Sequence, residues 1–302
     1  MSGPLEAENS KFQILDWGLL SGAAGIWGAS FFFIDIGLEA FAPGLVTFFR
    51  ITFGCITLWL IPVEKPLIER GDRKKIMMLG VTWMAFPLTM FPIAQQWINS
   101  SMTGMLNSAM PILTVIMGLI MFRIPTAAIQ LVGVATGLAG LFLIGIPEVT
   151  TDGTNALGVL LVVLAVLSYS VAVHIAGPLQ RKYGAIPVVR WALLFAVFLS
   201  TPYGVVGLTD SGFAWGPMIA CIALGAGGTG IAYAFAAELN GRVGAVRTSI
   251  VTYLIPIIAI FLGVIFRNDS ITVWAIIGTA IVLSGAFLTT LTKSNDSEQL
   301  IS

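Results

Sequence analysis

The chain of 302 residues is 57% hydrophobic and only 10% charged, and its net charge at neutral pH is zero. Soluble domains carry about 25% charged residues, so lipid is the expected solvent for most of this chain. Zero net charge argues against a nucleic-acid partner, and one histidine with two cysteines in apolar runs offers neither a metal site nor a disulfide framework.

Ten stretches are apolar enough to cross a bilayer as helices, each of which needs about 20 residues. They cover approximately residues 17–38, 43–62, 76–95, 98–121, 126–146, 157–177, 185–207, 215–238, 242–266 and 271–291. The first run is too long, and its flank too acidic, for a signal peptide, so we interpret it as the first span. The predicted fold is an all-α integral membrane protein, with tails at residues 1–16 and 292–302.

The basic residues orient these spans, because cytoplasmic loops are enriched in lysine and arginine. With the N-terminus in the cytoplasm, the outer loops hold only Arg267. The inner segments hold Lys11, Lys65, Arg70, Arg73, Lys74, Lys75, Arg123, Arg181, Lys182, Arg242 and Lys293. Both termini are therefore predicted to be cytoplasmic, in a multi-pass protein of the cell (inner) membrane.

The fourth span carries a face of small and polar residues around a central proline: Ser100, Gly104, Asn107, Pro111, Thr114 and Gly118. The pattern returns 145 residues later in the ninth span: Ala245, Ser249, Thr252, Pro256, Ala259 and Gly263. This repetition predicts two five-helix repeats, at residues 17–147 and 157–291, separated by the loop PEVTTDGTN.

The fourth and ninth spans are an odd number of spans apart, so the two repeats should be inverted in the membrane. Inverted repeats are typical of secondary transporters, whose substrate sites lie near the midplane between the halves. Pro111 and Pro256 each remove a helix hydrogen bond, and we expect them to act as hinges that open the cavity to each side in turn.

Several features together resemble the drug/metabolite transporter superfamily, specifically its EamA-type exporters. They are Trp27-Gly28-Ala29-Ser30-Phe31, Pro43 followed by Phe48-Phe49-Arg50, and the proline–glycine patterns of the fourth and ninth spans. The resemblance implies a central cavity lined mainly by spans 1, 3, 4, 6, 8 and 9, with spans 5 and 10 outside, and export of amino acids, related metabolites or toxic compounds. At position 35 many relatives carry a basic residue and this chain carries Asp35, so no charge rule for substrates transfers from that position.

Arg50 is the strongest candidate site residue. It lies some seven residues into a span, about 10 Å below the membrane surface, where a charged side chain is costly unless it has a partner or a function. Asp35 lies at similar depth, so an Asp35–Arg50 ion pair is predicted. The pair has two interpretations: a fixed link between spans 1 and 2, or a role in binding a substrate anion or in gating.

Other ionisable residues lie nearer the cytoplasmic ends of the spans. Arg190 and Arg247 are expected to snorkel to the interface. Glu238 is either one half of a helical ion pair with Arg242 or a carrier of a coupled proton. His174 is the second candidate for coupling, because histidine is the side chain most often used as a proton switch, or it is simply solvated at its helix end.

Polar aromatic and amide side chains in mid-span could contact a substrate or simply pack between helices. The strongest candidates are Trp27, Asn107, Tyr169, Tyr233 and Tyr253. The run Gly225-Ala226-Gly227-Gly228-Thr229-Gly230 matches a dinucleotide fingerprint, but it lies inside a span without a preceding strand, which favours close packing or local unwinding.

These features predict a secondary transporter working by alternating access, with a small molecule and the lipid bilayer as partners. Neither an enzyme nor a cofactor is expected, because the chain shows no nucleophile–base pair, paired carboxylates or nucleotide loop. Proton coupling, an uptake carrier or uniporter of the same fold, a passive channel, a receptor-like bundle and a homodimer stay open.

Overall fold

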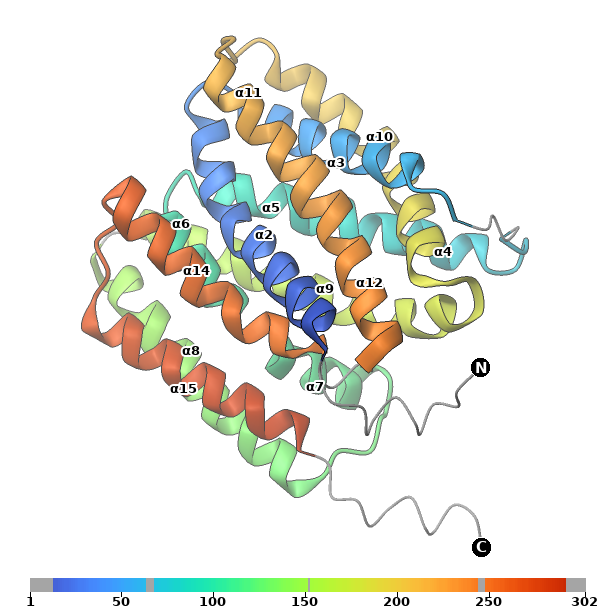
Figure 1. The fold of residues 1–302 in the computed structure, drawn as a ribbon. Coiled ribbons are helices and arrows are strands. Elements are labelled where there is room, and N and C mark those ends of the chain that lie inside the picture. Colours follow the sequence, from blue (N-terminus) through green and yellow to red (C-terminus); the bar gives the residue numbers. More distant parts are fainter. Residues whose placement is uncertain (1–12, 64–67, 152, 244–247, 292–302) are drawn as a thin grey trace, which may run out of the picture.

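The computed structural model describes residues 13–63, 68–151, 153–243 and 248–291, and over these ranges the chain folds into helices without a β-strand. Nine helices in the described part are long and apolar enough to cross a membrane, and a bent pair brings the total to ten. The helices run alongside one another in a bundle (Figure 1). The all-helical membrane architecture is confirmed, whereas inversion of the halves and the orientation of the termini stay predictions.

The helices of the first half are α2 (Ile14–Leu38), α3 (Pro43–Leu60), α4 (Arg73–Leu79), η1 (Gly80–Ala85), α5 (Phe86–Ala94), α6 (Ser100–Asn107), α7 (Met110–Met121) and α8 (Ala128–Thr151). Those of the second half are α9 (Gly153–Tyr183), α10 (Ala185–Gly207), α11 (Trp215–Ile222), η2 (Ala223–Ile231), α12 (Ala232–Val243), α14 (Ile250–Arg267) and α15 (Val273–Thr290). The run α4–η1–α5 forms the third span, α6–α7 the fourth and α11–η2–α12 the eighth.

The outer surface of the bundle is apolar. Phe142, Phe198 and Phe261 lie in three different spans and expose 66%, 69% and 56% of their surface. Exposed phenylalanines on several faces suit contact with lipid tails, in agreement with the low charge content of the chain.

The predicted loop between the halves is wrong for most of its length. The backbone is helical to Thr151 at the end of α8 and again from Gly153 at the start of α9. Apolar sequence marks only the part of a helix that lies in lipid, so both helices continue beyond their apolar runs.

The two repeated prolines have different surroundings. The fourth span breaks before Pro111, and α6 and α7 meet at a bend of 41°. Pro111 lies in the first turn of α7, where its missing N–H costs nothing. Helix α14 instead continues through Pro256 without a break. The sequence repeat is thus symmetric, whereas the conformation of its two copies is not.

A π-helical segment interrupts the third span of each half. It is η1 in the first half and η2 in the second. Such segments change the helical register and often occur at functional sites. The two π-helical segments occupy equivalent spans of the two halves, as expected if the halves arose by duplication. Segment η2 includes the glycine-rich run at residues 225–230.

Spans 5 and 10 pack through glycines. Helices α8 and α15 lie side by side at one edge of the bundle (Figure 1). A β-carbon at Gly285 would lie 2.5 Å from the Gly137 nitrogen and 2.6 Å from the Gly133 carbonyl oxygen. Gly133 and Gly137, four residues apart in α8, therefore let α15 approach closely, whereas Gly18, which forms a similar GxxxG pair with Gly22 in α2, has no neighbour within 4 Å.

Replacing Gly285 with alanine should force α8 and α15 apart and lower the free energy of unfolding by about 1–3 kcal/mol. The melting temperature of the purified protein measures the effect. Gly18→Ala is the matched control, because a β-carbon there meets open space. Equal melting temperatures for the two variants would contradict the glycine contact.

Candidate functional site

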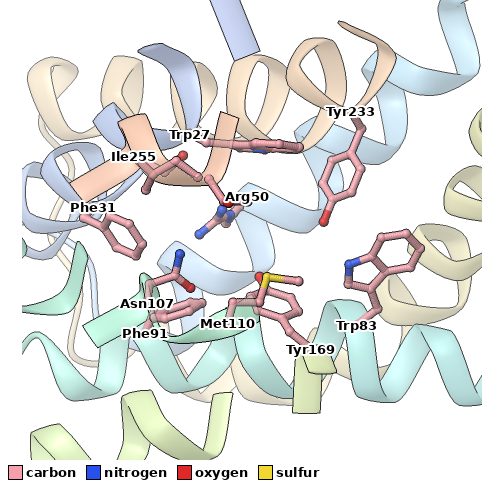
Figure 2. Close-up of a pocket in the computed structure, with 12 residues that line it drawn as sticks. Trp27, Phe31, Arg50, Trp83, Phe91, Asn107, Met110, Tyr169, Tyr233 and Ile255 are labelled. Atoms are coloured by element: carbon pink, nitrogen blue, oxygen red, sulfur yellow. The ribbon is translucent and has the colours of Figure 1, made fainter. Parts of the chain in front are cut away.

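A cavity of about 200 Å³ lies inside the bundle. Its lining comes from both halves of the chain: Trp27, Ser30, Phe31, Arg50, Trp83, Phe91, Asn107, Met110, Tyr169, Tyr233, Thr252 and Ile255. These residues belong to spans 1, 2, 3, 4, 6, 8 and 9, and none of them belongs to α8 or α15. Figure 2 shows their side chains converging on a common space.

Arg50 is the charged residue of this lining and comes from the middle of α3. It is 6% exposed, and its Nε donates a hydrogen bond to Thr229 Oγ1 at 3.1 Å. Its Nη1 is buried and has no hydrogen-bond partner. The guanidinium therefore keeps donor capacity in the cavity, where Figure 2 shows it directed towards Asn107.

The predicted Asp35–Arg50 ion pair is wrong. Asp35 instead accepts a hydrogen bond from Nε of Arg267, whose Nη1 donates to Glu39. The two residues lie at similar depths along their helices, but depth does not determine on which face of α2 Asp35 lies. That face meets the end of α14, so the basic residue beside Asp35 comes from the ninth span.

Small residues bring α3 and η2 close enough for the Arg50–Thr229 hydrogen bond. A β-carbon at Gly54 would lie 2.6 Å from Thr229 Cβ, and one at Gly225 would lie 2.6 Å from Phe53 Cβ. The glycine-rich run thus packs closely against α3, which is one of the two structural roles favoured for it. The contribution of Thr229 beside the site was not predicted.

Aromatic rings enclose the cavity on two sides of Arg50. On one side Tyr233 meets the rings of Trp27 and Trp83 edge to face, with centroids 5.4 and 5.6 Å away. Trp27 Nε1 also donates to the Gly228 carbonyl oxygen at 2.9 Å, which fixes the indole against η2. These contacts hold the rings in place before any ligand enters.

The opposite side is formed by a second group of rings. Phe91 meets Phe31 at a centroid distance of 5.5 Å and Tyr169 at 5.9 Å. Asn107 lies beside them at the end of α6, and its Oδ1 is buried without a hydrogen-bond partner. Asn107 and Thr252, one from each proline-containing span, both face the cavity.

Five of the predicted contact residues line this cavity and Tyr253 does not: the five are Trp27, Arg50, Asn107, Tyr169 and Tyr233. Tyr253 follows Thr252 in α14, and a step of one residue turns a helical side chain by about 100°. Seven lining residues were not predicted: Ser30, Phe31, Trp83, Phe91, Met110, Thr252 and Ile255. Ser30 and Phe31 lie in the Trp27–Phe31 motif, and Thr252 lies on the small-residue face of the ninth span, so these sequence patterns could have indicated cavity residues.

The two residues considered for proton coupling lie outside the lining. Glu238 is exposed on α12. His174 Nε2 hydrogen-bonds the Thr114 carbonyl oxygen at 3.0 Å, and its ring lies 4.7 Å from that of Phe122. The interpretation of His174 as simply solvated is therefore wrong. Arg242, the predicted helical partner of Glu238, pairs with Asp16 instead.

Arg190 does not snorkel. It is 3% exposed, and its Nη2 donates to the carbonyl oxygens of Leu58 and Ile61, both at 2.7 Å. The last carbonyl groups of a helix lack their regular N–H partners four residues on, so Arg190 caps α3 from the neighbouring α10. Arg247, the other residue expected to snorkel, lies outside the described residues.

Comparison with known proteins identifies the chain. The model of the EamA-like transporter family matches it twice, over residues 17–146 and 156–291. The chain belongs to the EamA-like transporter family. It is therefore a multi-pass membrane transporter, as the resemblance of its motifs implied.

Three relatives of this EamA-like transporter have names that give no substrate. The uncharacterized transporters YoaV and YdfC of Bacillus subtilis (strain 168) are 22% and 23% identical to it. Those alignments cover 89% and 88% of this chain and 94% and 88% of the relatives. A transporter of Buchnera aphidicola subsp. Schizaphis graminum (strain Sg) is 26% identical, with 82% and 85% covered.

A solved crystal structure shares the fold of this transporter. It superposes with a TM-score of 0.62 at 17% identity and covers 95% of this chain and 99% of its own. At that identity the likeness concerns the arrangement of the helices and not the substrate.

Replacing Arg190 with glutamine should lower the free energy of unfolding by about 1–3 kcal/mol, because two carbonyl oxygens at the end of α3 lose a charged donor. Thermal melting of the purified transporter measures the change. Arg181→Gln at the exposed end of α9 removes the same charge as a control. A melting temperature as high as that of the control would show that Arg190 does not cap α3.

Proposed function

We propose that this EamA-like protein is a secondary active transporter that exports a small metabolite, an amino acid or a related amphipathic or toxic compound, by alternating access. The observation that carries the proposal is the cavity, where the described lining residues place one charged group, Arg50, among aromatic rings. Eight of its lining residues fall in the first family match and four in the second. A ligand there contacts both halves, so movement of one half against the other exposes it to either side.

The size of the cavity supports a small substrate. Pockets for drug-sized ligands span roughly 300–1,000 Å³, and this cavity measures about 200 Å³. Proton coupling stays a separate proposal, because neither Glu238 nor His174 lines the cavity.

Contacts between spans 4 and 9 supply a candidate gate. Asp269 follows α14 and accepts hydrogen bonds from Ser101 N at 3.0 Å, from Ser101 Oγ at 2.6 Å and from Ser100 Oγ at 3.1 Å. The carboxylate thus caps the start of α6 and joins one end of the two proline-containing spans. Opening the bundle at this end requires these bonds to break.

Expression of the intact protein should make a defined solute leave cells, and Trp27→Ala should reduce that export about tenfold or more, because the ring contact is lost. Comparative metabolomics of cells and medium, at matched membrane levels, names the solute. Trp215→Ala removes an indole that is 72% exposed and is the control.

Three other results would change the proposal. Accumulation of a solute inside the cells would favour uptake, and flux without saturable counterflow would indicate a channel. No solute difference between expressing and empty cells would remove the export proposal.

A cross-link between positions 100 and 269 should abolish turnover, because it ties spans 4 and 9 together at the candidate gate. The double variant Ser100→Cys/Asp269→Cys can be oxidised selectively, since Cys55 and Cys221 are buried. Export should stop on oxidation and return on reduction, while each single variant stays unaffected by oxidant. Full turnover of the cross-linked protein would exclude opening at this end.

A further inference from the structure

The charge of the cavity is positive and unbalanced. Within the described ranges of the chain, Arg50 is the charged lining residue, and no aspartate or glutamate lines the cavity. The ion pairs of the described residues place Asp16 with Arg242, Asp35 and Glu39 with Arg267, and Glu69 and Asp72 with Lys182. No acid in the described part of the chain therefore forms an ion pair with Arg50.

Burial makes this imbalance costly. Arg50 is 6% exposed and keeps its charge, because a guanidinium does not lose its proton in proteins. A buried charge without a counter-ion is strongly unfavourable, and a hydroxyl such as that of Thr229 compensates only in part. An anion that enters the cavity recovers this free energy, whereas a neutral solute does not.

The free atoms of Arg50 indicate which anion fits. Nε is bound to Thr229, while Nη1 is buried without a partner and the guanidinium is directed into the cavity (Figure 2). Guanidinium groups bind carboxylates through parallel N–H donors, which gives both affinity and orientation. Asn107 Oδ1, also unpartnered, can accept a hydrogen bond from a hydroxyl or amide group on the same solute.

The other lining residues favour an apolar group on the solute and disfavour a positive charge. Rings and aliphatic side chains surround Arg50 and suit an aromatic or branched aliphatic group. An ammonium group would find no carboxylate among the lining residues that the structure describes, and in a low-dielectric site it would be repelled by Arg50. Contact with the ring faces offers a cation only a modest gain.

Resting on the transporter function proposed above, we propose that the substrate is a small organic monocarboxylate with an aromatic or aliphatic body and no ammonium group, and that Arg50 binds its carboxylate. The cavity thus prefers a net anion to a zwitterion of the same shape.

Matched probes test this preference on the intact protein without a variant. Phenylacetate, phenylalanine, phenylacetamide and phenethylamine present similar rings with an anionic, zwitterionic, neutral and cationic group. The transporter in lipid nanodiscs should bind phenylacetate most tightly and phenethylamine most weakly, as measured by calorimetry and ligand-induced thermal shift. Butyrate and its amide repeat the comparison with an aliphatic body.

Arg50 variants then test the residue. Arg50→Gln should weaken phenylacetate binding on the order of ten- to hundredfold and weaken phenylacetamide binding much less, because the amide loses a hydrogen bond but no charge pair. Arg50→Lys should restore part of the affinity, because it keeps the charge but not the planar donors. Arg73→Gln, at an exposed position outside the cavity, should bind like the intact protein.

The outcomes separate this inference from the transporter function. Equal or tighter binding of phenylalanine, phenethylamine or the amides, failure of every carboxylate to bind, or unchanged phenylacetate binding in Arg50→Gln would each overturn it. Export seen by metabolomics would leave the transporter proposal standing in all these cases. If no solute leaves cells, the export proposal fails whatever the probes do.

Discussion

The contact between α3 and η2 is the constraint on which the site depends. Gly54 and Gly225 remove the side chains that would hold these helices apart. The close approach lets Arg50 Nε reach Thr229 Oγ1, and the same π-helical segment presents the Gly228 carbonyl oxygen to Trp27. One packing arrangement therefore places the charged group and anchors one of the rings beside it. Larger residues at these glycines would displace both.

Lipid explains why polar groups recur at the helix ends and around the cavity. Backbone groups in a bilayer must be satisfied within the protein, and helices do this everywhere except at their ends and breaks. Arg190 satisfies the end of α3, and Asp269 satisfies the start of α6. Both residues reach a neighbouring helix, so the groups that complete one helix also join it to another.

Arg50 differs from these residues because its unpaired donor belongs to a side chain that lines the cavity, whereas Arg190, whose Nε is also buried without a hydrogen-bond partner, does not line it. Arg190 places Nη2 on two carbonyl oxygens, and Arg267 has two acidic partners. Arg50 binds one hydroxyl and otherwise faces the cavity. The contrast among three arginines of one protein separates those that hold helices together from one that is available to a solute.

Apolar length and charge were enough to predict the ten spans, because a span is a local property of about twenty residues in lipid. The sequence by itself also indicated the duplication, the family and five cavity residues, since small-residue faces and mid-span aromatics are visible in one helix. Tertiary structure alone decided the partners of Asp35 and Arg190, the exclusion of Tyr253 and the contribution of Trp83 and Phe91. Sequence gives the depth of a side chain along its helix, but the rotation of the helix and the neighbour it meets come from packing among all the spans.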